Sequence, residues 1–320
     1  LQLANLPPTS YRQVVRLLRL AHSDRLDYTV TPLEPGVYDD LVDLLLNQRL
    51  SQLQEHHLQA ALADVDPADI PLRIAEIAEV WVVRALQDIP EKERTDKAVE
   101  LSRRLLSLLR DLSPGAIQPS DELVTPLQRL TAVEAVTPDG GSQTIGRPLT
   151  PLRDTVLMTN ARGEPGVGRE LAAEVESAER IDLVCAFIRW TGIREMLPAL
   201  RRHVEVGRAL RIITTVYTGT TELRALETLR ELGAQVRVSY DVTKTRLHAK
   251  AWLFHRSNGH STVYIGSSNL TYQAQVTGLE WNVRAAQSTN PALVGKFEAT
   301  FESYWANSQF EEFDAGKFET

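Results

Sequence analysis

Two largely apolar runs, IDLVCAFI (181–188) and LRIITTV (210–216), constrain the fold of this chain more than any other feature. Each run has the length of a β-strand, and neither alternates like a strand with one face in water. An amphipathic segment with helical spacing, GIREMLPALRRHV (192–204), separates them. Buried strands that alternate with helices are typical of an α/β sheet with parallel segments. We therefore predict such a sheet in the second half of the chain.

Further segments of the second half extend this alternation. We expect helices over 168–180, 192–204, 221–233 and 292–308, and further strands over 235–240, 248–254, 261–266 and 280–286. The strands over 248–254 and 261–266 are separated by RSNGH, whose Asn and Gly favour a hairpin-like turn. The sheet is thus predicted to be flanked by helices and to contain neighbouring strands with short connections.

The first half of the chain has a different pattern. Apolar residues recur there at helical spacing, which predicts amphipathic helices over 9–22, 37–53, 70–89 and 97–112. Pro114 and Gly115 follow the last of these segments and are strong helix stops. We expect a helical bundle that serves as a scaffold, a dimerisation domain or a docking site for a partner.

The intervening segment is rich in Pro, Gly, Ser and Thr, which favours a linker or an irregular connection. Strand structure is an alternative for LQRLTAVEAV (127–136) within it. The predicted organisation is a helical N-terminal domain over 1–112, a connection over 113–152 and an α/β domain over 153–310.

The charge of the chain is unevenly distributed. The net charge is −7, because residues 1–150 hold 15 Lys and Arg against 22 Asp and Glu, whereas residues 151–320 hold 20 of each. The acidity belongs to the helical half and weakly disfavours nucleic-acid binding. The neutral second half can still form a local basic groove for nucleic acid.

The sequence also bears on the cellular setting. Cys185 is the single cysteine, so an internal disulfide is excluded and an intracellular, cytoplasmic location is favoured. No apolar run reaches the roughly 18 to 20 residues of a membrane span, and no signal-peptide pattern opens the chain. We expect no membrane partner. The start at Leu1 suggests a piece of a longer protein.

Two short motifs in the second half carry groups suited to phosphate chemistry. On a strand over 248–254, His248 and Lys250 leave the same face, with Trp252 after them. An imidazole is a competent nucleophile and acid/base, and an ammonium stabilises an oxyanion. Gly266-Ser267-Ser268-Asn269 follows the next predicted strand and offers backbone donors, hydroxyls and an amide for phosphate oxygens. Each motif alone is common, but together on consecutive strands they indicate a phosphate site.

His248-x-Lys250 followed by Gly266-Ser267-Ser268-Asn269 resembles the HKD signature of the phospholipase D superfamily, over roughly residues 155–307. The resemblance implies a phospholipase D-like mixed sheet flanked by helices, preceded here by an all-α domain. It implies catalytic roles for His248, Lys250 and Asn269, and substrate contacts for Ser267 and Ser268. HAKAWLFHR, YIGSSNLT and GLEWNVR look like the single-HKD domain at the N-terminal end of certain bacterial superfamily-2 helicases, so a helicase domain is expected in the full-length protein.

Two positions qualify this resemblance. The HKD aspartate falls at His255, where the alternatives are a residue beside the turn and a substitute acid or base. In the nuclease branch of the family, an acidic residue that hydrogen-bonds the catalytic histidine follows the asparagine at a spacing that leads here to Glu280. Its alternative role is that of an ordinary residue on a surface strand.

The implied chemistry is a metal-independent phosphodiester hydrolysis without a cofactor. Family members with one HKD set form homodimers, in which one histidine attacks phosphorus and its twin protonates the leaving oxygen. Nucleic acid is the favoured substrate, with DNA ahead of RNA. The alternatives are an inactive nucleic-acid-binding module and, less favoured, a lipid phosphodiesterase.

Other residues are candidates for substrate contacts. Tyr217 lies in TTVYTGTT, just after a predicted strand, where open α/β sheets commonly bind ligands. Arg246 and Lys244 precede His248 and could contact phosphates along a strand of nucleic acid. The alternative for both basic residues is a solvated loop.

Overall fold

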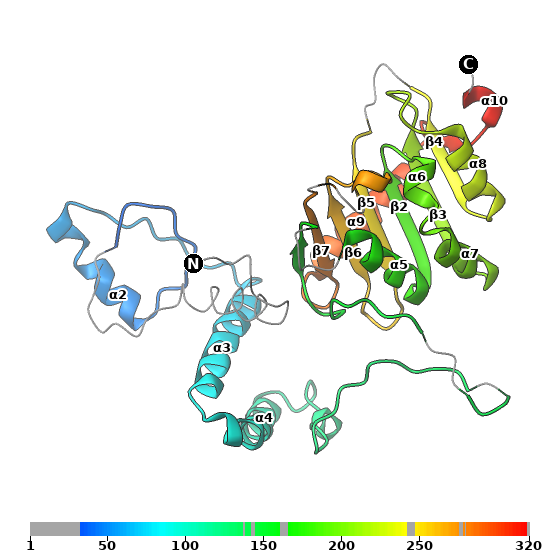
Figure 1. Ribbon diagram of the computed structural model, residues 1–320. Coiled ribbons are helices and arrows are strands. Elements are labelled where there is room, and N and C mark those ends of the chain that lie inside the picture. Colours follow the sequence, from blue (N-terminus) through cyan, green and yellow to red (C-terminus); the bar gives the residue numbers. More distant parts are fainter. Residues whose placement is uncertain are drawn as a thin grey trace. The chain divides into compact units, whose positions relative to one another are not determined.

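The computed structural model describes residues 33–136, 138–141, 145–160, 166–241, 247–274, 278 and 280–318. The chain divides into two compact units, with the division between Thr131 and Ala132 (Figure 1). The first unit is helical and the second is built on a mixed β-sheet. No helix among the described residues is both long and apolar enough to cross a membrane.

The helical unit contains α2 (Leu44–Ser51), α3 (Ile70–Gln87), α4 (Glu91–Leu112) and the short 3-10 helices η2 (Leu53–His56) and η3 (Pro119–Asp121). The helix predicted over 37–53 begins only at Leu44, because the side chain of Asp43 accepts a hydrogen bond from the backbone N–H of Leu46 and caps it there. The helix predicted over 9–22 lies outside the described residues.

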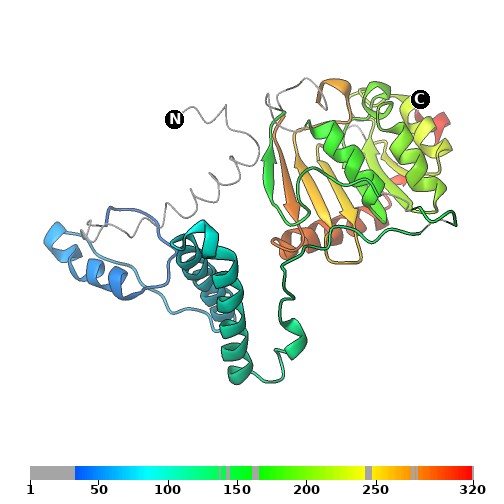
Figure 2. The ribbon, with the colours of Figure 1, turned by 60° about the horizontal axis from the view of Figure 1, so that its bottom comes forward.

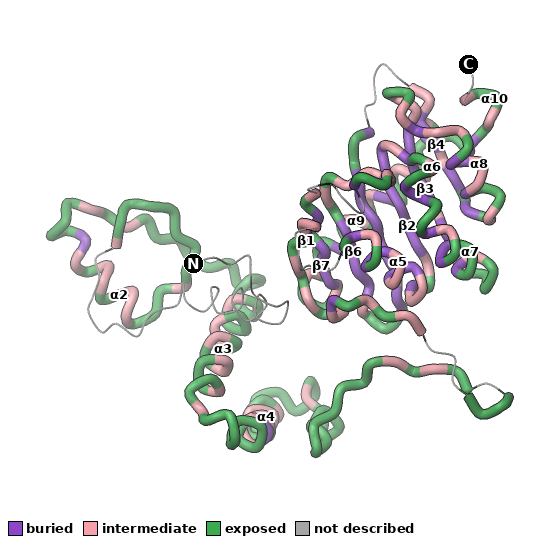
Figure 3. Tube along the Cα trace, viewed as in Figure 1, coloured by how far each residue is buried: buried purple, intermediate pink, exposed green. Residues whose placement is uncertain are grey.

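These described helices do not enclose a core. Leu53 and Val99 are their buried hydrophobic residues, and Trp81 on α3 is 60% exposed. Figure 3 shows α3 in the colours of intermediate and exposed residues. The strand considered over 127–136 is wrong, since no named strand forms there and Leu130 and Val133 are exposed. The described part of the first half is therefore helical, as predicted, but its helices bury few side chains.

The second unit contains an eight-stranded sheet among its described residues. Its strands are β1 (Val156–Met158), β2 (Arg180–Cys185), β3 (Ala209–Thr215), β4 (Gln235–Ser239), β5 (Lys250–His255), β6 (Thr262–Gly266), β7 (Asn282–Ala286) and β8 (Glu311–Glu312). The spatial order is β1-β7-β6-β5-β2-β3-β4-β8. Strands β2, β3 and β4 are parallel and the other neighbours are antiparallel, which confirms the predicted mixed sheet.

Helices cover both faces of this sheet (Figure 2). Its helices are α5 (Val167–Ser177), α6 (Trp190–Ile193), α7 (Leu197–Glu205), α8 (Leu223–Glu231), α9 (Pro291–Ala306) and α10 (Ala315–Phe318). The segment predicted as one helix over 192–204 is divided between α6 and α7, and Pro198 lies in the first turn of α7. Trp252 and Phe254 of β5 pack in the core cluster that includes residues of α5, α7 and α8, whereas Leu253 packs with Val294 of α9.

The register of the sheet brings several loops to one edge. Cys185 at the end of β2 pairs with Lys250 at the start of β5, and Gly266 at the end of β6 pairs with Asn282 at the start of β7. The ends of the parallel strands β3 and β4 meet the end of β2 at this same edge. The two predicted phosphate-binding motifs therefore lie on neighbouring strands at a single edge.

Candidate active site

His248 and Lys250 are in direct contact at the beginning of β5. The Nζ atom of Lys250 lies 2.8 Å from Nδ1 of His248 and donates to the His248 carbonyl oxygen at 2.7 Å. Strand β5 begins at Lys250 rather than at His248 as predicted, so the imidazole is exposed while the Lys250 side chain is buried. The His248 ring is thus open to solvent, and the lysine beside it is held in the sheet.

Phe187, which follows β2, packs against both of these side chains. Its ring makes an edge-to-face contact with His248 at 5.7 Å between centroids, and the Lys250 ammonium lies 5.9 Å from its centroid. The sequence motifs gave no signal for this residue, because the contact depends on the pairing of β2 with β5. The Phe187 ring therefore lies beside both the imidazole and the ammonium.

The charge of Lys250 has no paired carboxylate within the described residues. Burial lowers the pKa of Lys250, and the negative charge of Glu280 opposes this effect without forming an ion pair. The nearby Cys185 thiol stays neutral, since burial raises its pKa to about 11. A buried cation without a counter-ion is costly unless an anion joins it. An anion beside the Lys250 ammonium would offset this cost.

The Gly266–Asn269 turn is held against β7. A Cβ atom at Gly266 would overlap the Trp281 carbonyl oxygen and the Asn282 side chain, so only glycine fits this close approach. The Asn282 amide donates a hydrogen bond to the Ser268 hydroxyl at 2.7 Å. Asn282 is buried and was missed by the sequence analysis, although a polar residue on the buried face of a strand is a usable signal. These contacts fix the position of the turn.

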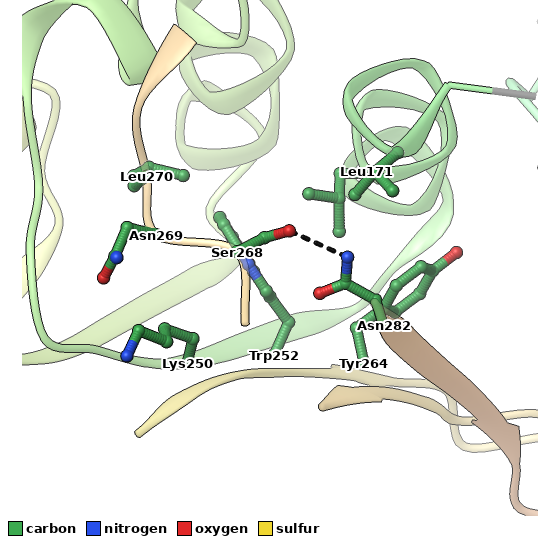
Figure 4. Close-up of a pocket in the computed structure, with 9 residues that line it drawn as sticks. Leu171, Lys250, Trp252, Tyr264, Ser268, Asn269, Leu270 and Asn282 are labelled. Atoms are coloured by element: carbon green, nitrogen blue, oxygen red, sulfur yellow. Dashed lines mark hydrogen bonds between the residues drawn. The ribbon is translucent and has the colours of Figure 1, made fainter. Parts of the chain in front are cut away.

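Asn269 lies with Lys250 in the wall of one pocket. Figure 4 shows the two side chains on the same side of this pocket. Its lining residues are Val167, Leu171, Lys250, Trp252, Tyr264, Ser268, Asn269, Leu270 and Asn282. The Oδ1 atom of Asn269 is buried and has no hydrogen-bond partner in the part of the chain that the structure describes. The pocket wall thus holds an acceptor oxygen without a partner and an ammonium without a paired carboxylate among the described residues.

Glu280 lies at the same edge but contacts the turn rather than the imidazole. Its carboxylate accepts a hydrogen bond from the Ser267 hydroxyl, which also accepts one from the backbone N–H of Trp281 at 3.1 Å. The contact expected between Glu280 and His248 therefore stays a prediction. Ser267 is exposed and Ser268 is half-buried.

The remaining candidates for substrate contacts are less closely tied to the site. Tyr217 lies in the loop that follows β3, where its backbone N–H donates to the Thr215 hydroxyl at 3.1 Å. Arg246 and Lys244 lie outside the described residues. The roles suggested for these three residues stay predictions.

His255 occupies the opposite end of β5 from Lys250, roughly 17 Å along the strand. Its Nε2 atom lies 2.5 Å from an oxygen of Asp182, which is fully buried and also bound by Arg211 at 2.7 and 2.8 Å. Burial alone would raise the pKa of Asp182, but the hydrogen bonds from His255 and Arg211 hold it below its usual value. Of the two roles considered for His255, this separation from the pocket argues against a substitute acid or base.

Comparisons with known proteins agree with the motifs in the sequence. Residues 171–305 match the family model described as "Cardiolipin synthase, PLD-like domain". A comparison with curated proteins finds no match.

Solved structures similar to part of this chain include those of three bacterial proteins. Nuc from Salmonella typhimurium, a phospholipase D family member, is 21% identical over 50% of this chain and 97% of its own, with a TM-score of 0.40. NucT from Helicobacter pylori is 14% identical over 50% of this chain and 99% of its own, with a TM-score of 0.38. Phosphatidylserine synthase from Haemophilus influenzae is 14% identical over 50% of this chain and 39% of its own, with a TM-score of 0.36. The family match covers residues 171–305, which hold the HxK and GSSN motifs and strands β2 to β7 of the mixed sheet.

Proposed function

We propose that this chain is a metal-independent phosphodiesterase that cleaves nucleic acid, with DNA as the preferred substrate. The observation that carries the proposal is the buried Lys250 ammonium, which has an imidazole at 2.8 Å and no paired carboxylate among the described residues. A phosphodiester supplies the missing negative charge and places its phosphorus atom beside the nucleophile. The side-chain NH2 of Asn269, in the same pocket wall, would donate a hydrogen bond to a non-bridging oxygen of the same phosphate.

The proposed reaction has two steps. A ring nitrogen of His248 attacks the phosphorus atom, a P–N bond forms, and the P–O bond to the leaving group breaks. A second histidine gives its proton to the leaving oxygen. That histidine then removes a proton from water, which attacks the phosphohistidine, breaks the P–N bond and releases the phosphate. Lys250 and Asn269 stabilise the negative charge that develops on the equatorial oxygens.

The second histidine is proposed to come from another copy of the chain. The pocket wall and the exposed His248 beside it supply one HxK motif and one GSSN turn. His255 sits at the far end of β5 beside Asp182 and cannot act on the same phosphate. A homodimer with its twofold axis at the site would bring two His248 side chains together. A longer protein with a helicase domain remains the proposed context.

A lipid phosphodiesterase is the second candidate, because the matching family model is described as a cardiolipin synthase domain. A nucleic-acid-binding module without catalytic activity is the third. The three differ in what they bind and in whether His248 becomes covalently modified.

The decisive experiment compares wild type with His248→Ala on labelled single-stranded DNA, double-stranded DNA, RNA and phosphatidylglycerol vesicles, in excess EDTA. We expect EDTA-resistant cleavage of nucleic acid by wild type and its loss in the variant. Quenching during turnover with alkaline detergent should preserve a base-stable, acid-labile phosphate adduct that maps to His248. Full nuclease activity of His248→Ala contradicts the proposal, and cleavage of the vesicle lipid alone selects the second candidate.

A further inference from the structure

Arginine and aromatic side chains gather beside the Gly266–Asn269 turn, on segments that the proposed chemistry does not use. They come from the segment after β2, from the start of α8 and from the loop after the turn. We call this set the arginine–aromatic surface; its members are Arg189, Trp190, Arg194, Arg224 and Tyr272.

Within this surface, guanidinium groups lie over aromatic rings. The Arg224 guanidinium is 4.0 Å from the centroid of the Trp190 ring, and that of Arg194 is 6.0 Å from the centroid of Tyr272. The side chains of Arg189 and Arg194 are about half exposed, at 47% and 49%, and Tyr272 is exposed. The guanidinium groups of Arg189 and Arg194 and the ring of Tyr272 are thus accessible to a ligand.

The surface is fixed to the candidate active site through the backbone. The N–H of Arg189 donates to the Leu270 carbonyl at 3.0 Å, and the N–H of Leu270 donates to the Phe187 carbonyl at 3.1 Å. Leu270 directly follows Asn269, and the Phe187 ring contacts His248. A Cβ atom at Gly192 of α6 would overlap the Leu270 carbonyl, so the two segments are in close contact. A polymer bound in the pocket would leave it across this surface.

The charges favour a phosphate-bearing ligand. Among the described residues, two carboxylates form ion pairs with these arginines: Glu222 lies 3.8 Å from Arg189, and Glu195 lies 2.9 Å from Arg194. Both are exposed ion pairs, which are weak and can exchange their carboxylate for a phosphate. The arginines outnumber these carboxylates, so the surface retains positive charge.

The side-chain types favour nucleic acid over a lipid surface. Binding to a bilayer needs exposed aliphatic or aromatic side chains that insert among the acyl chains. Of the large hydrophobic residues that are exposed, Tyr272 is the one contributed by this surface, and its neighbours are arginines. Aromatic rings beside guanidinium groups instead match the stacking platforms that bind unpaired bases.

We propose that the arginine–aromatic surface binds single-stranded nucleic acid next to the scissile phosphate and gives the enzyme a preference for unpaired strands. The inference rests on the proposed function, because it assumes a polynucleotide in the pocket. Bases of a single strand can stack on Tyr272, whereas those of a duplex are already stacked on each other. Arg189, Arg194 and Arg224 bind the phosphates of that strand.

The test measures binding in full-length protein that carries His248→Ala, so that the probe stays intact. Fluorescence anisotropy with a short labelled oligonucleotide compares single-stranded and duplex DNA at several salt concentrations. Tyr272→Ala should weaken single-strand binding roughly ten-fold and duplex binding much less. Tyr272→Phe should retain the affinity, because it keeps the ring. Arg194→Ala should reduce the salt dependence by about one phosphate contact.

Arg201→Ala is the matched control, since Arg201 is an exposed arginine on α7, outside the surface; it should bind like the parent. Equal single-strand affinity of Tyr272→Ala and Tyr272→Phe, or an equal loss for duplex, overturns the inference. Tyr272-dependent binding of phosphatidylglycerol vesicles in place of DNA also overturns it. If wild type binds single strands through Tyr272 but cleaves none, the surface stands and the proposed function fails.

Discussion

The Nζ atom of Lys250 lies 2.8 Å from Nδ1 of His248, and the lysine is the buried member of the pair. Removing the charge of Lys250 should lower the cleavage rate but raise the stability of the protein. We expect Lys250→Met to lower the cleavage rate at least a hundred-fold, roughly the effect of losing one oxyanion donor. The variant should also melt at a higher temperature than wild type, because an uncompensated buried charge is replaced by an apolar side chain.

The pH dependence of stability checks this interpretation. Burial lowers the pKa of Lys250 in the folded state below its unfolded value, so the folded protein releases its proton first as the pH rises. Wild-type stability should therefore rise between the folded and the unfolded pKa of Lys250, and Lys250→Met should lack this rise. Calorimetric melting of both proteins across the alkaline range measures it. A variant less stable than wild type at neutral pH contradicts the prediction.

The hydrogen bond between Asn282 and Ser268 should support the turn that carries Asn269. We expect Asn282→Ala to lower the cleavage rate, because the Ser268 hydroxyl loses its donor and the turn gains freedom. A double-mutant cycle with Ser268→Ala should give a coupling free energy of about 1 kcal/mol in stability. Strictly additive losses in urea denaturation would show that the two side chains act independently.

The strands and helices of the second unit were predictable where the hydrophobic pattern is long. The apolar runs of β2 and β3 could hardly be anything but buried strands, and residues 223–231 and 291–306 are helical as expected. Strands β1 and β8 were missed, because runs as short as Val156–Met158 and Glu311–Glu312 show no period. They become strands by pairing with β7 and β4.

Site residues were predictable where a motif is local in sequence. HxK and GSSN each lie within a few consecutive residues, so their chemistry can be recognised from the sequence alone. Phe187 and Asn282 enter through pairings between distant segments, which no local pattern reveals. Glu174 was the hardest of these residues to predict, because in the sequence it is an ordinary charged residue of an amphipathic helix. Its partners Arg256 and Arg284 follow 82 and 110 residues later.

Glu174 on α5 should contribute strongly to the stability of the α/β unit. It is fully buried and binds Arg256 at 2.5 Å and Arg284 at 3.0 Å. Both arginines are buried as well, so Glu174→Ala would leave two cations without their counter-ion. We expect a loss of roughly 3–5 kcal/mol in the free energy of unfolding. Urea denaturation measures this loss. The control is Glu176→Ala, at a partly exposed position on the same helix, which should lower the free energy of unfolding by less than about 1 kcal/mol.

Asp182 should make the unit sensitive to acid. Hydrogen bonds from His255 and Arg211 hold the pKa of this buried carboxyl below its unfolded value. Its contribution to stability is therefore complete above the unfolded pKa and disappears as the pH falls through the folded one. Denaturant titrations of wild type and Asp182→Asn should differ most near neutral pH and converge in acid. A constant difference across that range contradicts the prediction.

Restoring the aspartate of the HKD signature should harm this protein. In His255→Asp, a new carboxylate would face Asp182, whose oxygen now lies 2.5 Å from the imidazole. Two carboxylates in that position repel each other, although Arg180 and Arg211 lie near them. We expect a loss of roughly 1–3 kcal/mol in the free energy of unfolding. The cleavage rate of the folded fraction should stay close to wild type, because His255 lies at the far end of β5 from Lys250.

The exchange variant His255→Asp with Asp182→His provides the control for this prediction. It keeps one imidazole and one carboxylate in contact, so it should recover part of the stability lost in His255→Asp. Chemical denaturation at neutral pH, with cleavage assayed below the melting temperature, separates the two effects. If His255→Asp alone is more stable than wild type, the imidazole–carboxylate pair is not what fixes this end of the strand. The HKD aspartate would then be compatible with a carboxylate already present on β2.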